Sequence, residues 1–242
     1  MSNSLDNIIA VVLAGGFGTR IKHLLPDVPK PMAAIADKPF LGWVLDYLHR
    51  QGIDQALLST GYLAEVIERY AQSQPVSEME LACYPETEPL GTAGGFVNAV
   101  NQSHKEPKAW LVLNGDSLMV TDLAPLNEYL NDETVDGVIL GVSVTDASRF
   151  GSLVYDEQKT LLQFAEKRSG AGVINGGVYL LRDRLIQHFP PNVPLSFEYD
   201  VFPSLLQQNF CLKVHPVTAP FLDIGTPESL AQAETFIRQY FI

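Results

Sequence analysis

The sequence has little cysteine and no long hydrophobic run. Its longest apolar run, Ile8 to Ala14, is far shorter than the about 20 residues that a membrane span needs. Cys83 and Cys211 stand alone, without a CxxC pair or metal-ligand spacing. The first residues, MSNSLDN, lack the basic start of a secretory signal peptide. These absences predict a cytoplasmic protein with no membrane partner.

Positive charge is also scarce. The chain carries 16 Lys and Arg against 28 Asp and Glu, a net charge of −12, which argues against a nucleic-acid partner. The negative net charge does not exclude a small anionic substrate, because a local Lys or Arg or a metal ion can override the electrostatic field of the whole protein. The five histidines show no ligand spacing, and the sequence has no Ser/His/Asp or Cys/His pattern of nucleophilic catalysis.

Strand-like runs alternate with helical periods through the first part of the chain. Strands are expected at 8–13, 55–59, 81–84, 109–113 and 135–144, and helices at 39–50, 64–72 and 95–101. This order predicts an α/β fold, a mostly parallel twisted sheet of the Rossmann-like type with helices on both faces.

From about residue 151 the pattern becomes richer in strands. A hairpin is expected at 152–155 and 161–166, further strands at 176–181, 212–217 and 221–225, and helices at 198–208 and 227–240. We find no linker or repeat, so we expect one domain, 1–242. Its first half would span about 1–145, and its β-rich second half, about 146–242, would cover one side of the sheet.

The stretch LAGGFGTR, residues 13–20, follows the first buried strand. It is not a Walker A loop, because counting from Gly15 places Arg20 where that motif needs glycine. It is not a dinucleotide fingerprint either, because the last glycine would have to be Ile21. Two readings of the glycines stay open: a loop whose N–H groups and Arg20 face an anion, or a tight turn between strand and helix.

The segment PDVPKPM, residues 26–32, holds Lys30 between two prolines, which restrict the backbone. Further motifs follow in order: EPLGTAGG at 88–95, NGDS at 114–117, FG at 150–151, EK at 166–167, NGGVY at 175–179 and DIGTP at 223–227. With these motifs the sequence resembles the sugar-1-phosphate nucleotidyltransferases over essentially its whole length. In that family a sugar-1-phosphate oxygen attacks the α-phosphorus of a nucleoside triphosphate, and pyrophosphate departs.

The resemblance implies that the first half, about 1–145, binds the nucleotide and that the second half, about 146–242, binds the sugar phosphate. It also implies a role for particular residues. Arg20 and Lys30 would be catalytic, stabilising charge on the reacting phosphates. Asp116 and Asp223 would hold Mg²⁺. The nucleotide would be bound by Leu13, Ala14, Gly15, Gly16, Gly18, Thr19, Arg20, Gly91, Thr92, Asn114 and Asp116. The sugar phosphate would be bound by Gly151, Glu166, Lys167, Asn175 and Gly177.

Each of these motifs also has a purely structural interpretation. NGD can be a plain turn, and Asp223 can cap the helix expected at Thr226. The EPLGTAGG segment can be a simple helix start, Glu166 and Lys167 a solvated strand end, and the glycines of NGGVY a strand bulge.

The choice of base and sugar rests on resemblance alone. The EPLGTAGG form looks most like guanylyltransferases and predicts GTP. The stretch PKPMAAIADKPFLGWVLDYL and the compact ending favour D-glycero-α-D-manno-heptose 1-phosphate, a precursor for surface polysaccharides, as the sugar. Mannose 1-phosphate, N-acetylmuramate 1-phosphate, or UTP, CTP or dTTP are alternatives, and the chain is compatible with a homo-oligomer. A non-catalytic nucleotide-sugar sensor is a further alternative, although such a protein would be free to lose the charged residues named above.

Overall fold

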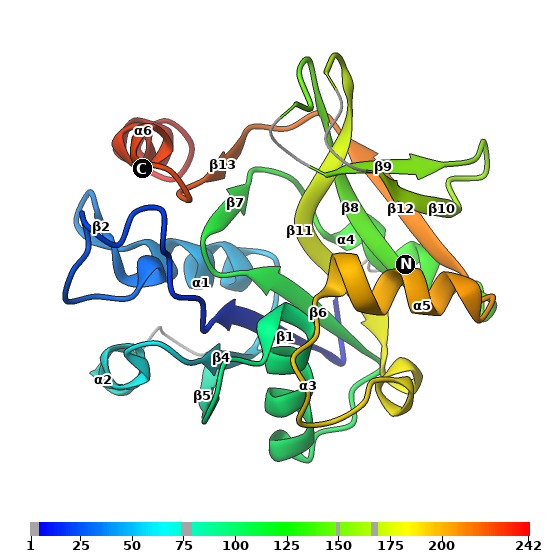
Figure 1. Cartoon of the computed structure of the whole chain (residues 1–242), viewed down its shortest axis with the longest axis horizontal. Helices are drawn as coiled ribbons and strands as arrows, with labels where there is room; N and C mark the ends of the chain where they lie inside the picture. Colours follow the sequence, from blue (N-terminus) through cyan, green and yellow to red (C-terminus); the bar gives the residue numbers. More distant parts are fainter. Residues whose placement is uncertain (1–4, 74–78, 149–150, 166–168) are drawn as a thin grey trace.

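The computed structural model describes residues 5–73, 79–148, 151–165 and 169–242. Within these residues, one sheet of nine strands runs through both halves of the chain (Figure 1). Its strands are β1 (Ile8–Ala14), β4 (Gln55–Thr60), β5 (Glu80–Pro85), β6 (Ala109–Asn114), β8 (Gly137–Val144), β9 (Ser152–Tyr155), β10 (Leu161–Ala165), β11 (Gly172–Arg182) and β12 (Leu212–Val217).

The sheet is parallel in the first half of the chain and mixed in the second. Strands β6, β1, β4 and β5 are neighbours in that order and all run parallel. Strand β11 then pairs antiparallel with β6 along one edge and with β8 along the other, and β12 joins β8 in parallel. The hairpin expected around residues 152–166 is confirmed as the antiparallel pair β9–β10.

The β-rich half therefore extends the sheet and does not cover one side of it, which corrects that expectation. The reason is the length of β11. Its residues Val178 to Arg182 pair with β6, while Ile174, nearer its start, pairs with β9. One long strand thus serves both halves, and hydrophobic periodicity carries no information about which strand it will pair with.

Helices cover both faces of the sheet, as predicted. They are α1 (Phe40–Arg50), α2 (Ala64–Ser73), α3 (Gly91–Ser103), α4 (Ala124–Tyr129), α5 (Phe202–Gln207) and α6 (Pro227–Tyr240). Shorter turns are the 3₁₀ segments η1 (Lys30–Met32) and η2 (Asp183–His188) and the π-helical turn η3 (Phe197–Val201). None of the helices in the described part of the chain is long and apolar enough to cross a bilayer.

Strand β1 shows how alternation divides the core. Ala10 and Val12 belong to the hydrophobic cluster that contains the buried residues of α1, α2 and α6. Val11 points the other way, into the cluster formed with α3 and α5. Because successive side chains of a strand face opposite sides, one buried strand supplies both cores.

Two small sheets lie outside the main one. Strand β7 (Ser117–Met119) pairs antiparallel with β13 (Phe221–Asp223), and β2 (Ala34–Ile35) pairs with β3 (Lys38–Pro39). The sequence predicted β13 but not its partner β7. A three-residue strand directly after NGD is too short to leave a periodic signal.

The start of α3 is fixed by a segment from the other half of the chain. The N–H of Leu195 donates to the carbonyl of Leu90 (2.8 Å), and the N–H of Ala93 donates to the carbonyl of Leu195 (2.9 Å). Gly91 has a positive φ of 71°, and a Cβ there would lie 2.6 Å from the Leu195 carbonyl oxygen. The helix consequently begins at Gly91, four residues before the predicted start.

We expect Gly91→Ala to lower the free energy of unfolding by at least about 2 kcal/mol, because it combines a left-handed backbone with a backbone clash. Gly52→Ala is the matched control: φ is 81° there, but a Cβ would meet nothing within 4 Å, so its cost should stay near about 1 kcal/mol. Urea unfolding of both variants would measure the difference. Equal costs would contradict the close packing of Leu195 on Gly91.

Candidate active site

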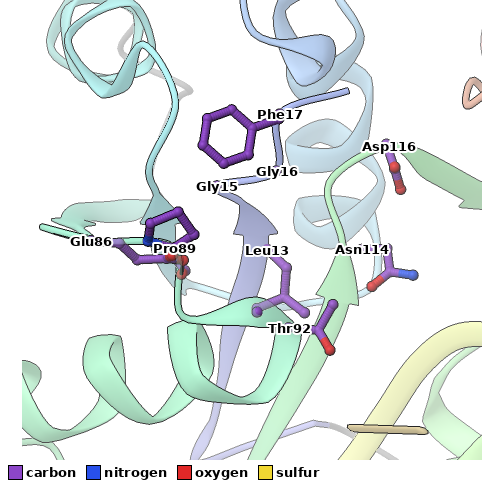
Figure 2. A pocket seen from close by; sticks show the side chains of 11 residues that line it. Leu13, Gly15, Gly16, Phe17, Glu86, Pro89, Thr92, Asn114 and Asp116 are labelled. Atoms are coloured by element: carbon purple, nitrogen blue, oxygen red, sulfur yellow. Dashed lines mark hydrogen bonds between the residues drawn. The ribbon is translucent and has the colours of Figure 1, made fainter. Parts of the chain in front are cut away.

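A pocket opens at the carboxyl ends of the parallel strands β1, β4 and β6, the edge where open α/β sheets bind ligands. It is lined by Leu13, Gly15, Gly16, Phe17, Ser59, Glu86, Pro89, Gly91, Thr92, Asn114 and Asp116. Figure 2 shows Glu86 and Pro89 at one end and Asn114 and Asp116 at the other. Most of the residues predicted to bind the nucleotide are therefore brought together.

The remaining nucleotide-site predictions lie outside this lining. The side chain of Ala14 is buried in the core shared with α1. Gly18, Thr19 and Arg20 follow the pocket in the loop after β1. Gly18 has a positive φ of 58°, and a Cβ there would come within 3.2 Å of the Lys30 Cβ, so the loop packs on the stem of this lysine. Lys30 itself lies in η1, directly after Pro29.

Lys30 forms an ion pair with Asp116, which ends the turn after β6. Strand pairing brings the second predicted carboxylate close, because Asp223 of β13 lies opposite Ser117 of β7. The N–H of Ile224 donates to the backbone carbonyl of Asp116 (3.0 Å) and fixes the same approach. Asp116 and Asp223, more than a hundred residues apart in sequence, thus share one site.

The electrostatics of this site favour a cation. Burial raises the pKa of Asp223 above its ordinary value, and the neighbouring Asp116 raises it further. Lys30, the N–H of Gly225 and Arg20 act in the opposite direction, in that order, but do not cancel the rise. A group disfavoured in its charged form by burial and by a second carboxylate gains when a cation binds. In the described residues we find no cluster of three or more His, Cys, Asp or Glu around a common point.

Asp223 does not cap the helix that follows it. Thr226 is the N-cap of α6, and its side chain and that of Ser229 form a reciprocal capping box. The Asp223 carboxylate instead accepts a hydrogen bond from the N–H of Gly225 (2.6 Å). The capping interpretation of this residue is therefore wrong.

Glu86 was missed by the sequence reasoning. Its backbone N–H donates to Thr60 (2.7 Å), and its half-buried carboxylate accepts from the N–H of Leu90 (2.9 Å) and from the Ser59 hydroxyl (3.4 Å). Burial raises the pKa of this carboxyl. In the described part of the chain no Lys or Arg forms an ion pair with it. An acidic residue just beyond the end of a parallel strand, two positions before EPLGTAGG, was the available signal.

A Cβ on Gly15 would lie 2.7 Å from Glu86 Oε1, so glycine at this position leaves room for the carboxylate. Thr92 has a structural bond of its own: its hydroxyl accepts from the N–H of Phe197 (3.1 Å). Glycine and threonine in these motifs therefore support the pocket walls as well as lining the pocket.

Two of the predicted sugar-phosphate residues meet the nucleotide pocket at the β6–β11 junction. Gly177 has a positive φ of 70° at a bulge in β11, and a Cβ there would clash with the Asn114 amide. Asn175 accepts from the N–H of Gly177 (3.0 Å) and donates to the Tyr179 hydroxyl (2.8 Å). That hydroxyl donates in turn to Glu198 (2.9 Å). Asn175 is thus held in place by a partly buried polar network.

Gly151 lies near Asn175, whose N–H donates to the Gly151 carbonyl (3.2 Å). Glu166 and Lys167, the EK pair predicted to contact the sugar phosphate, lie outside the described residues.

Known proteins share this arrangement of sequence and fold. The nucleotidyl transferase family model matches residues 9–240. The D-glycero-alpha-D-manno-heptose 1-phosphate guanylyltransferase of Campylobacter jejuni is 36% identical over 90% of this chain and 95% of its own. The mannose-1-phosphate guanylyltransferase of Mycobacterium tuberculosis is 33% identical over 92% of this chain, which spans 62% of that protein.

A solved structure, HddC from Yersinia pseudotuberculosis complexed with GMP-PN, superposes with a TM-score of 0.81 at 37% identity, covering 94% of this chain and 98% of that one. The family model extends over nearly the whole chain, and the pocket lies at the sheet edge where the family's motifs converge. The chain belongs to the nucleotidyl transferase family.

Proposed function

We propose that this protein transfers GMP from GTP to D-glycero-α-D-manno-heptose 1-phosphate, releasing pyrophosphate and giving the GDP-heptose. One observation carries the proposal: one end of a single pocket is lined by Glu86, which forms no ion pair among the described residues, and the other end is lined by Asp116, which is paired with Lys30. The similarity to heptose 1-phosphate guanylyltransferases supports the choice of sugar. A cytoplasmic location, where GTP is supplied, fits this role.

Glu86 supports guanine because its chemistry matches only one base edge well. Guanine presents an N1–H and a 2-amino group side by side, two donors in the plane of the ring. An ionised carboxylate offers only acceptors, and it has two oxygens to meet both donors. Adenine places an acceptor next to its amino group, and uracil and thymine flank one N–H with two carbonyls. A carboxylate facing these edges would leave an acceptor opposed to an acceptor.

The reaction needs charge neutralisation and alignment. An oxygen of the sugar phosphate forms a new bond to the α-phosphorus while the bond to the departing pyrophosphate oxygen breaks in line. The Arg20 guanidinium and the Asp223 carboxylate both lie next to Gly225. Arg20 and Lys30, the two cations that act on Asp223, would stabilise the negative charge of the reacting phosphates. Asn175, Gly151 and Gly177, with Glu166 and Lys167, would receive the sugar phosphate.

A pyrophosphate-release screen tests the proposal directly. GTP, ATP, UTP, CTP and dTTP would each be paired with the 1-phosphates of heptose, mannose, glucose and N-acetylmuramate. We expect the highest kcat/KM for GTP with heptose 1-phosphate. A preference for mannose 1-phosphate would favour the second candidate, suggested by the mycobacterial relative. Binding without turnover for every pair would favour a sensor.

Glu86→Gln tests the guanine contact. The amide replaces one acceptor oxygen with a donor that would face a donor of guanine. We expect kcat/KM for GTP to fall about 10- to 100-fold, as for a lost bidentate base contact, while kcat/KM for UTP stays equal or rises. Inosine triphosphate (ITP) lacks the 2-amino group. The substitution should therefore lower kcat/KM less for ITP than for GTP. If the ratio of kcat/KM for GTP to kcat/KM for ITP were the same in wild type and variant, the contact between Glu86 and guanine would be contradicted.

We also propose that Asp116 and Asp223 hold Mg²⁺, a hard cation that takes oxygen ligands. When bound, the ion would neutralise phosphate charge. Asp223→Asn keeps the acceptor for Gly225 but removes the disfavoured charge, so in EDTA its melting temperature at pH 7.5 should equal or exceed that of wild type. Mg²⁺ should raise the melting temperature of wild type only, and the variant should lose activity. Equal Mg²⁺ shifts in both proteins would contradict this site.

A further inference from the structure

Phe17 is a large apolar side chain that is exposed to solvent. It stands in the glycine loop after β1 and is 47% exposed. Within the described residues it belongs to neither hydrophobic core, nor to the partly buried side chains packed against them. Exposure of an aromatic ring in a loop that is otherwise small and polar needs a reason, because removing such a ring from water is favourable.

The ring lies on the pocket wall. Phe17 lines the main pocket, and it also lines a smaller adjoining pocket with Tyr62 and Pro89. Figure 2 shows the ring above Gly15 and Gly16, with Pro89 and Leu13 below the loop on the side of the pocket. Because Leu13, Phe17 and Glu86 line the same pocket, a planar group bound there can reach the Phe17 ring.

Tyr62 contacts the Phe17 ring. The two ring centroids are 5.5 Å apart with a tilt of 45°, within the range of favourable aromatic pairs. Lys22 Nζ lies 4.6 Å from the Tyr62 ring centroid. The backbone N–H of Tyr62 donates to the Gly15 carbonyl (3.2 Å), so Tyr62 is attached to the same loop that carries Phe17. Tyr62 lines the adjoining pocket but not the candidate active-site pocket, whereas Phe17 lines both, so part of Phe17 faces the active-site pocket without Tyr62.

We propose that the Phe17 ring stacks on the purine base of the bound nucleotide and closes the outer wall of its pocket. The inference rests on the proposed function and deepens it, because it separates affinity from selectivity. Every base has a π-face, so a stacking ring binds purines without distinguishing them. Selection of guanine would remain with the in-plane acceptor Glu86.

The test uses Phe17→Ala and the matched control Leu24→Ala. Leu24 is also 47% exposed and lies in the same part of the chain, but it does not line the pocket. We expect Phe17→Ala to raise the KM for GTP about 5- to 150-fold, with kcat and the KM for the sugar 1-phosphate within about twofold of wild type. The control should leave all three values unchanged.

Phe17→Trp supplies a direct probe, because the native Trp43 and Trp110 are buried and give a constant background. Guanosine and GMP should quench the emission of the new indole, whereas inorganic tripolyphosphate should not. A normal GTP KM in Phe17→Ala, or equal quenching by tripolyphosphate, would overturn the inference. Light scattering tests one alternative. If Phe17→Ala had a lower oligomeric mass than wild type but an unchanged affinity for GTP, the ring would belong to an interface between copies and the inference would be overturned.

Failure of the proposed function would look different. If wild type uses ATP instead of GTP and Phe17→Ala raises the KM for ATP, the stacking role stands and the guanine assignment falls. If wild type uses a pyrimidine nucleotide, both fall. If wild type uses GTP and Phe17→Ala is silent, the proposed function stands and the stacking role falls.

Discussion

The pairing of β11 with β6 is the contact on which the site depends. It runs from Val178 opposite Leu113 to Arg182 opposite Ala109 and joins the two halves of the chain in one sheet. The same pairing brings the bulge at Gly177 against Asn114, which lines the nucleotide pocket. The regions proposed for the two substrates thus share one backbone ladder. For a transfer that needs two phosphates in line, such a shared ladder would help to hold the alignment.

The sequence predicted what depends on local pattern. The strand before LAGGFGTR, the helix after Pro39 and the helix starting at Pro227 all have strong periodicity or clear end signals, and the structure confirms them. The convergence of Asp116 and Asp223 came from the family resemblance and could not come from periodicity. It is produced by two strands of three residues each, below the length at which a pattern can be read.

Glu86 and the glycines of α3 illustrate what the sequence could not supply. The role of a half-buried carboxylate depends on what encloses it, here Gly15, Ser59 and the N–H of Leu90. The resemblance implies that Gly91 binds the nucleotide, yet its own backbone constraint is the carbonyl of Leu195, about a hundred residues later in the chain. Gly16 differs, since a Cβ there would meet nothing within 4 Å. At Gly16, therefore, the protein itself leaves room for a side chain. A requirement for glycine there would come from a bound ligand that approaches the backbone.

The two-stranded pairing of β7 with β13 also makes the acidic pair a property of the tertiary structure. Asp116 directly follows β6, whereas Asp223 lies in β13, more than a hundred residues later. Opening of this short pairing would separate the two carboxylates, while the ladder of β6, β1, β4 and β5 does not contain either strand. Local unfolding of two three-residue strands would therefore remove the proposed cation site without unfolding the sheet.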